Sequence, residues 1–161
     1  MSGPDAGHPG AGDAAPREGM WERPRVFISH SSTDSWVAQQ LAAGIQRCGA
    51  DTFLDDSDIH HGDAFEDRIL DAEKQCSELV VLLTPWAMAR PWVWIEISFF
   101  KHSRKRIVGI LHGVSLDAIA QHPYAAILLK TLDMVDINHV DSYFEQLTRR
   151  VRAGEERGTD V

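Results

Sequence analysis

Short apolar runs alternate along this chain with amphipathic segments of helical length, and this alternation restricts the fold more than any other feature. The clearest run, residues 79–83, is apolar throughout, which is typical of a central strand in a parallel sheet that is covered on both faces. Four further strands are expected at residues 26–28, 52–54, 107–111 and 134–137. Strands and helices in this rhythm predict a flavodoxin-like, three-layer α/β fold. Its five-stranded parallel sheet has the order 2-1-3-4-5, with helices on both faces.

Helical periodicity marks the segments between these runs. Apolar side chains recur at helical spacing from Trp36 to Ile45, and Gly49 stands where a glycine would end that helix. Further helices are expected from Phe65 onward, over residues 92–100, and over residues 143–151. Each helix therefore follows a strand, as right-handed crossovers require.

The patterned region defines one domain, expected over residues 25–152. The first 24 residues contain five glycines and four prolines and few large apolar side chains. Such a composition cannot bury enough surface to offset its chain entropy, so residues 1–24 are predicted to be a flexible tail. Residues 153–161 are predicted to be a second, shorter tail.

The charge balance and the cysteines exclude several classes of function. With 24 acidic and 16 basic side chains the formal net charge is −8, which argues against a general nucleic-acid binder or a binder of anionic membranes. Cys48 and Cys76 lie outside any CxxC spacing and the histidines are scattered, so no metal site is expected. The sequence has no signal peptide and no membrane span, and a cytoplasmic location is expected.

The predicted topology points to one site. Ligands of doubly wound sheets bind beyond the carboxyl ends of the strands, where the strand order reverses. Near that position Glu96 is the single acid in an aromatic segment. On a helix Trp92 and Glu96 share a face, so the indole and the carboxylate can converge on one ligand. A packed Trp92 and an exposed Glu96 without function would have the same spacing.

Three weaker candidates follow the first two strands. His30 and Ser31 precede a helix whose unpaired N–H groups suit a ribose or a pyrophosphate, although simple helix capping explains these residues equally well. Asp55, at the end of the second strand, suits either a ribose contact or a turn.

The basic run at residues 101–106 is expected only to complement a helix dipole and aid solubility.

Four short motifs occur in a fixed order across the predicted domain. They are VFISH at 26–30, FLD at 53–55, GxxF at 62–65, and a tryptophan four residues before a glutamate, Trp92 and Glu96. In this order they resemble the TIR (Toll/interleukin-1 receptor) domain family, particularly its bacterial members that cleave NAD⁺. The resemblance spans residues 25–152. In the family pattern Ser-x-Trp-Cys-x-x-Glu, Arg90 and Val93 replace the serine and the cysteine here.

The resemblance implies an enzyme, an NAD⁺ glycohydrolase or cyclase whose catalytic residue is Glu96. Trp92, His30, Ser31 and Asp55 would contact the substrate. Nicotinamide leaves NAD⁺ as a neutral molecule, so no general acid is needed, and one carboxylate that stabilises the oxocarbenium-like charge can suffice. NAD⁺ would be the substrate, and no cofactor is expected.

The resemblance also implies assembly. The loop at residues 56–62 is similar to the BB loop through which TIR domains stack, and it contains Asp56, Asp58, Ile59 and Gly62. Other TIR domains are therefore expected partners, together with a sensor protein in trans. Self-assembly would activate the enzyme in antiphage signalling or NAD⁺ depletion.

Three other classes of protein share this topology or this stacking. A non-catalytic TIR adaptor would act by homotypic interaction alone, and a nucleoside deoxyribosyltransferase is a remote enzymatic alternative. A phosphorylated receiver needs acids after the first strand and at the end of the third. Ser29-His30 and Thr84-Pro85 occupy those places instead.

Overall fold

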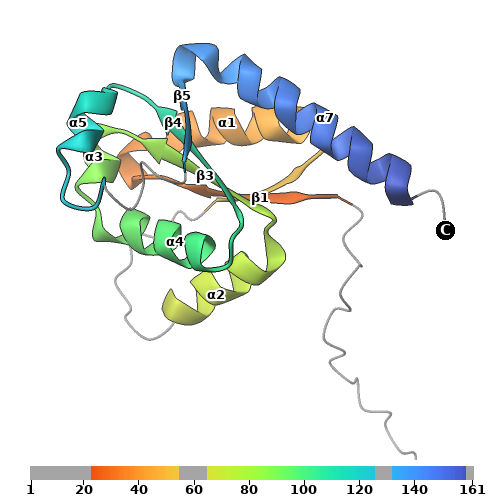
Figure 1. Ribbon diagram of the computed structural model, residues 1–161, viewed down its shortest axis with the longest axis horizontal. Helices are drawn as coiled ribbons and strands as arrows, with labels where there is room; N and C mark the ends of the chain where they lie inside the picture. Colours follow the sequence, from red (N-terminus) through yellow and green to blue (C-terminus); the bar gives the residue numbers. More distant parts are fainter. Residues whose placement is uncertain (1–22, 55–64, 126–131, 159–161) are drawn as a thin grey trace, which may run out of the picture.

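The computed structural model describes residues 23–54, 65–125 and 132–158. Their five strands form one parallel sheet in the order β2-β1-β3-β4-β5, which confirms the predicted fold class and strand order (Figure 1). The strands are β1 (Arg25–Ser29), β2 (Asp51–Leu54), β3 (Glu78–Leu83), β4 (Arg106–Leu111) and β5 (Asp133–Asp136). Phe27 of β1 pairs with Phe53 of β2 on one side and with Leu79 of β3 on the other.

Helices cover both faces of this sheet. One face packs against α1 (Ser35–Arg47) and α7 (Val140–Gly158), and the other packs against α2 (Phe65–Gln75) and α4 (Pro91–His102) (Figure 1). Successive side chains of a strand point to opposite faces. Val80 and Leu82 therefore belong to the α1/α7 layer, and Leu79, Val81 and Leu83 to the α2/α4 layer.

Several short elements were not expected from the sequence. These are the 3₁₀ turns η1 (Ser32–Asp34) and η2 (Ile137–His139), and the helices α3 (Pro85–Met88) and α5 (Leu116–Ala120). Gly49 follows α1 with φ +91°, the left-handed conformation predicted for a helix-ending glycine. Helix α7 continues to Gly158, so the segment expected to be a tail after Arg152 begins as helix.

The basic run at residues 101–106 makes contacts that the sequence did not predict. Lys101 and His102 occupy the last turn of α4, as expected for a dipole role. Lys105, however, reaches α2, where its Nζ lies 3.1 Å from the Glu73 carboxylate and donates to the Cys76 carbonyl at 2.9 Å. Burial alone would raise the pKa of Glu73, but hydrogen bonds with Ser103 and Lys105 outweigh burial and lower it. The run therefore also fixes the end of α2.

No helix within the described ranges has the length and apolar content needed to cross a bilayer.

Candidate functional site

The carboxyl end of β1 and helix α4 meet at a hydrogen bond between two buried side chains. Ser29, the last residue of β1, donates from Oγ to Oε2 of Glu96. The exposed fraction is 0% for Ser29 and 5% for Glu96. Glu96 thus lies inside the molecule beside the point where the strand order reverses, and the alternative of an exposed helix residue is wrong.

The sequence of α4 explains why a carboxylate is buried here. The helix begins with Pro91 and is largely apolar, as helices enclosed by the rest of a protein are. Its buried positions include Val93, Ile97 and Phe100, which lie three or four residues from Glu96 or directly beside it. Glu96 therefore occupies the stripe of α4 that faces the sheet.

The two tryptophans of α4 have different environments. Trp94 is buried, its Nε1 donates to the Met88 carbonyl at 3.0 Å, and its ring stacks on His122 with centroids 4.3 Å apart. Trp92 is half-buried in the first turn of α4. Trp94 is consequently a packing residue, whereas Trp92 keeps part of its surface available for a ligand.

The loop after β1 places two predicted residues next to Ser29. His30 is 9% exposed, and its Nδ1 lies 3.5 Å from the Ile28 carbonyl. Ser31 is 2% exposed and accepts a hydrogen bond from the Thr33 N–H at 3.4 Å, so it caps η1. The 3₁₀ turn η1 is thus what Ser31 caps, whereas α1 follows Asp34 without a side-chain cap. His30 directly follows Ser29, the residue that contacts Glu96.

The remaining predicted site residues lie outside the described part of the chain. These are Asp55 and the four residues of the expected assembly loop, Asp56, Asp58, Ile59 and Gly62.

A second buried hydrogen bond, which sequence reasoning missed, joins the turn after β1 to the end of β3. Thr84 follows β3 and donates from Oγ1 to Asp34 Oδ2 at 2.5 Å, and both side chains are buried. The Thr84 hydroxyl also accepts from the Ala87 N–H at 3.0 Å and so caps α3. The sequence shows a polar residue, Thr84, directly after the third strand, but nothing in the spacing pairs it with Asp34, 50 residues earlier.

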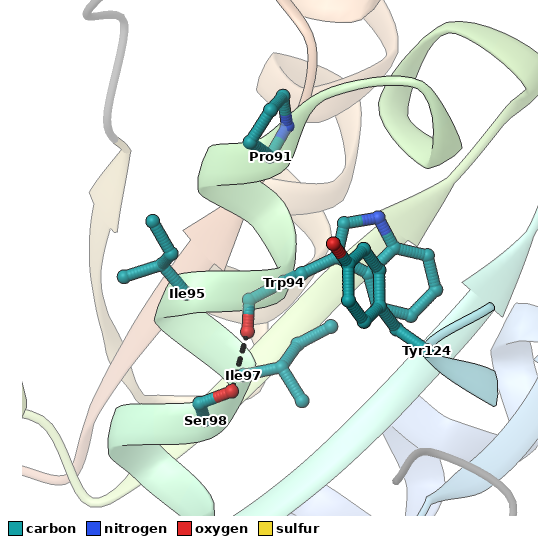
Figure 2. Close-up of a pocket in the computed structure, with 6 residues that line it drawn as sticks. All are labelled: Pro91, Trp94, Ile95, Ile97, Ser98 and Tyr124. Carbon is teal, nitrogen blue, oxygen red and sulfur yellow. Dashed lines mark hydrogen bonds between the residues drawn. The ribbon is translucent and has the colours of Figure 1, made fainter. Parts of the chain in front are cut away.

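Two hollows lie near this region. One, of about 700 Å³, opens between α3, α5 and the end of β5, and its lining includes Met88, Ser115 and Asp136. The other, of about 300 Å³, lies along the outer side of α4, where the Tyr124 ring stands against the Trp94 indole (Figure 2). Neither of these two hollows is lined by Glu96. The described residues contain no cluster of three or more His, Cys, Asp or Glu side chains that could hold a metal ion.

This arrangement suits stabilisation of positive charge. A carboxylate in a water-poor environment interacts more strongly with a developing cation than it would in water. Because a fixed hydroxyl holds one carboxylate oxygen, the charge is already oriented before a ligand binds.

Comparison with known proteins agrees with this architecture. The family model described as TIR domain matches residues 26–151. The TIR domain of the Toll-related receptor TRR-2 from Hydra magnipapillata superposes with a TM-score of 0.58 at 23% identity, covering 79% of this chain and 97% of that one. The TIR domains of the activated Roq1 resistosome give a TM-score of 0.51 at 16% identity, covering 86% and 85% of the two chains.

A curated relative is also similar in sequence. It is the Brachypodium distachyon protein named "Probable 2' cyclic ADP-D-ribose synthase BdTIR", 30% identical over 94 residues. The match covers 57% of this chain and 42% of the relative, so it spans less than half of that protein's length. With the family model matched from residue 26 to residue 151, the chain belongs to the TIR domain family.

Proposed function

We propose that this protein cleaves the bond between nicotinamide and ribose in NAD⁺, as a glycohydrolase or a cyclase, with Glu96 as its catalytic residue. The observation that carries the proposal is the burial of the Glu96 carboxylate at the carboxyl end of β1, where Ser29 holds it. The similarity to BdTIR, which is named a probable 2' cyclic ADP-D-ribose synthase, supports the same chemistry.

The chemistry needs one acid. As the glycosidic bond lengthens, positive charge develops on the ribose while nicotinamide becomes neutral, so the leaving group needs no proton. Glu96 would stabilise that charge through the ribose hydroxyls, and Trp92 would stack on the nicotinamide ring and exclude water. His30 and Asp55 are proposed to contact the ribose or the phosphates. Ser31, which caps η1, would contribute mainly by shaping the loop.

Assembly is proposed to control this activity. The neighbouring structure of Roq1 comes from an activated resistosome, which supports partnership with other TIR domains. Trp36 and Trp86 are 69% and 54% exposed, and they follow β1 and β3 on the side of the sheet where these strands end. Tryptophan is among the residues enriched at protein–protein interfaces. A sensor protein in trans would promote the assembly, in antiphage signalling or NAD⁺ depletion within the cytoplasm.

A nicotinamide-release assay tests the proposal. The purified chain is incubated with NAD⁺, dilute and under crowding conditions that favour assembly, and nicotinamide and ADP-ribose products are separated by chromatography. Mass spectrometry and NMR then distinguish linear from cyclised ADP-ribose. Release by the wild type and its loss in Glu96→Gln support the proposal.

The matched control is Glu145→Gln, which makes the same chemical change on α7 at a side chain that is 71% exposed. This variant is expected to keep full activity. Absence of nicotinamide in both states of the wild type would reject the enzyme and favour the adaptor, which acts only by TIR–TIR interaction.

A further inference from the structure

Ser29 ends β1 at a fully buried position, directly after three buried apolar residues. Val26, Phe27 and Ile28 precede it in β1, and all four side chains are 0–1% exposed. Side chains two residues apart share a face of a strand, so Ser29 faces the same layer as Phe27, which packs with the buried residues of α4. An apolar side chain would be expected at such a position. The serine instead donates its hydroxyl to Glu96.

The two partners of this hydrogen bond differ in how firmly the fold holds them. The backbone of Ser29 is fixed by the sheet, where it pairs with Val81 of β3. The Glu96 carboxylate stands at the end of a side chain with three rotatable bonds on a different element, 67 residues away in the sequence. The Ser29 side chain has one torsion angle, χ1, so its hydroxyl oxygen can occupy few positions. The more flexible Glu96 side chain therefore takes the orientation that this oxygen allows.

We propose that Ser29 is a positioning residue for Glu96. Its hydroxyl holds Oε2 and thereby sets the orientation of the carboxylate toward the ribose of NAD⁺. Loss of the hydroxyl would remove this constraint on Oε2 and shift the carboxylate from the productive geometry, and misplacement of a reacting group by about 1 Å typically costs about 100-fold in rate. This inference rests on the proposed function.

Two variants of Ser29 with side chains of the same shape separate the effect of the hydroxyl from the effect of side-chain volume. Ser29→Thr keeps the hydroxyl and Ser29→Val lacks it, while both add similar bulk. Ser29→Ala removes the hydroxyl without adding bulk. Ser77→Ala is the control, because the Ser77 hydroxyl donates to the Arg25 carbonyl at the amino ends of β1 and β3, away from Glu96.

The readouts are kcat and KM for NAD⁺, together with the circular dichroism spectrum of each variant. Ser29→Val and Ser29→Ala are expected to lose about 100-fold in kcat with KM changed by less than about threefold. Ser29→Thr is expected to restore kcat to within about fivefold of the wild type, and Ser77→Ala to match it. If Ser29→Val does not fold, Ser29→Ala shows the effect of losing the hydroxyl, and Ser29→Thr shows the effect of added bulk with the hydroxyl kept.

Two results overturn the inference while the proposed function stands. One is an active wild type whose kcat survives in Ser29→Val and Ser29→Ala. The other is a Ser29→Thr variant as impaired as Ser29→Val, because the hydroxyl would then not be the cause. A wild type and Ser77→Ala control that both release no nicotinamide reject the proposed function itself, and the inference with it.

Discussion

The hydroxyl of Thr84 lies 2.5 Å from a carboxylate oxygen of Asp34 and so joins the end of β3 to the turn that follows β1. The same hydroxyl accepts the Ala87 N–H, which makes it a junction between two chain segments and the start of α3. Since the side chains of Asp34 and Thr84 are only 5% and 0% exposed, water cannot readily replace either bond.

Thr84→Val is therefore expected to destabilise the protein by about 2–3 kcal/mol. It preserves the shape of the side chain but leaves a buried carboxylate and a backbone N–H without the hydroxyl. Urea unfolding measures the change, and Thr84→Ser, which keeps the hydroxyl, is the control. A loss in Thr84→Val no larger than that in Thr84→Ser would show that the bond contributes little.

If Glu96 acts as proposed, Glu96→Ala is expected to lower kcat for nicotinamide release by about 10²–10³-fold, because it removes the charge proposed to stabilise the ribosyl cation. The circular dichroism spectrum should remain that of the wild type, since the substitution shortens one side chain of α4. Steady-state kinetics with NAD⁺ provide the measurement. Undiminished release by the folded variant would assign catalysis to another residue.

Glu78 is expected to give the protein an unusual dependence of stability on pH. Burial raises the pKa of this carboxyl, and Arg150 at 2.7 Å and Arg106 at 3.9 Å only partly offset the effect of burial. An acid with a raised pKa in the folded state contributes stability below its unfolded pKa of about 4.3, and that contribution is lost as the pH rises through the folded pKa.

The unfolding free energy of the wild type minus that of Glu78→Gln should therefore be more positive near pH 4 than near pH 7. Urea titrations at several pH values test this expectation, and all other carboxyls cancel in the difference. A difference that instead grows toward neutral pH would mean that the two arginines outweigh burial.

The two cysteines are expected to differ in reactivity. Cys76 is 2% exposed, and burial raises the pKa of its thiol to about 12, so its thiolate fraction at pH 8 is about 10⁻⁴. Cys48 is only partly buried. Ellman's reagent should modify Cys48 in the folded protein and reach Cys76 only after unfolding in urea. Equal rates for the two thiols in the native state would contradict this expectation, and Cys76→Ser assigns the signals.

Strand positions and strand order were predictable because burial on both faces produces continuous apolar runs, of which β3 is the clearest. Local chemistry also predicted the end of α1 at Gly49, where a positive φ favours glycine. Short helices such as α3 and α5 were not predictable, since four or five residues are too few to display helical periodicity.

The candidate site was predictable only in part. Topology and spacing placed Glu96 near the crevice, but not its contact with Ser29, because nothing in the local sequence couples residues 67 positions apart. Spacing singled out Trp92, four residues before Glu96, but could not show that Trp94 is the more buried of the two, because that depends on what packs against each ring. The role of Lys105 was missed for the same reason, because its partners lie on α2.

The division of β3 between two layers limits how this chain can change in length. Val80 and Leu82 serve one layer, and Leu79, Val81 and Leu83 serve the other. Inserting or deleting a single residue within the strand would exchange these two sets, so that each layer would receive side chains shaped for its counterpart. Folded variants of this protein should therefore tolerate insertions and deletions in the connections between elements, while the central strands keep their lengths.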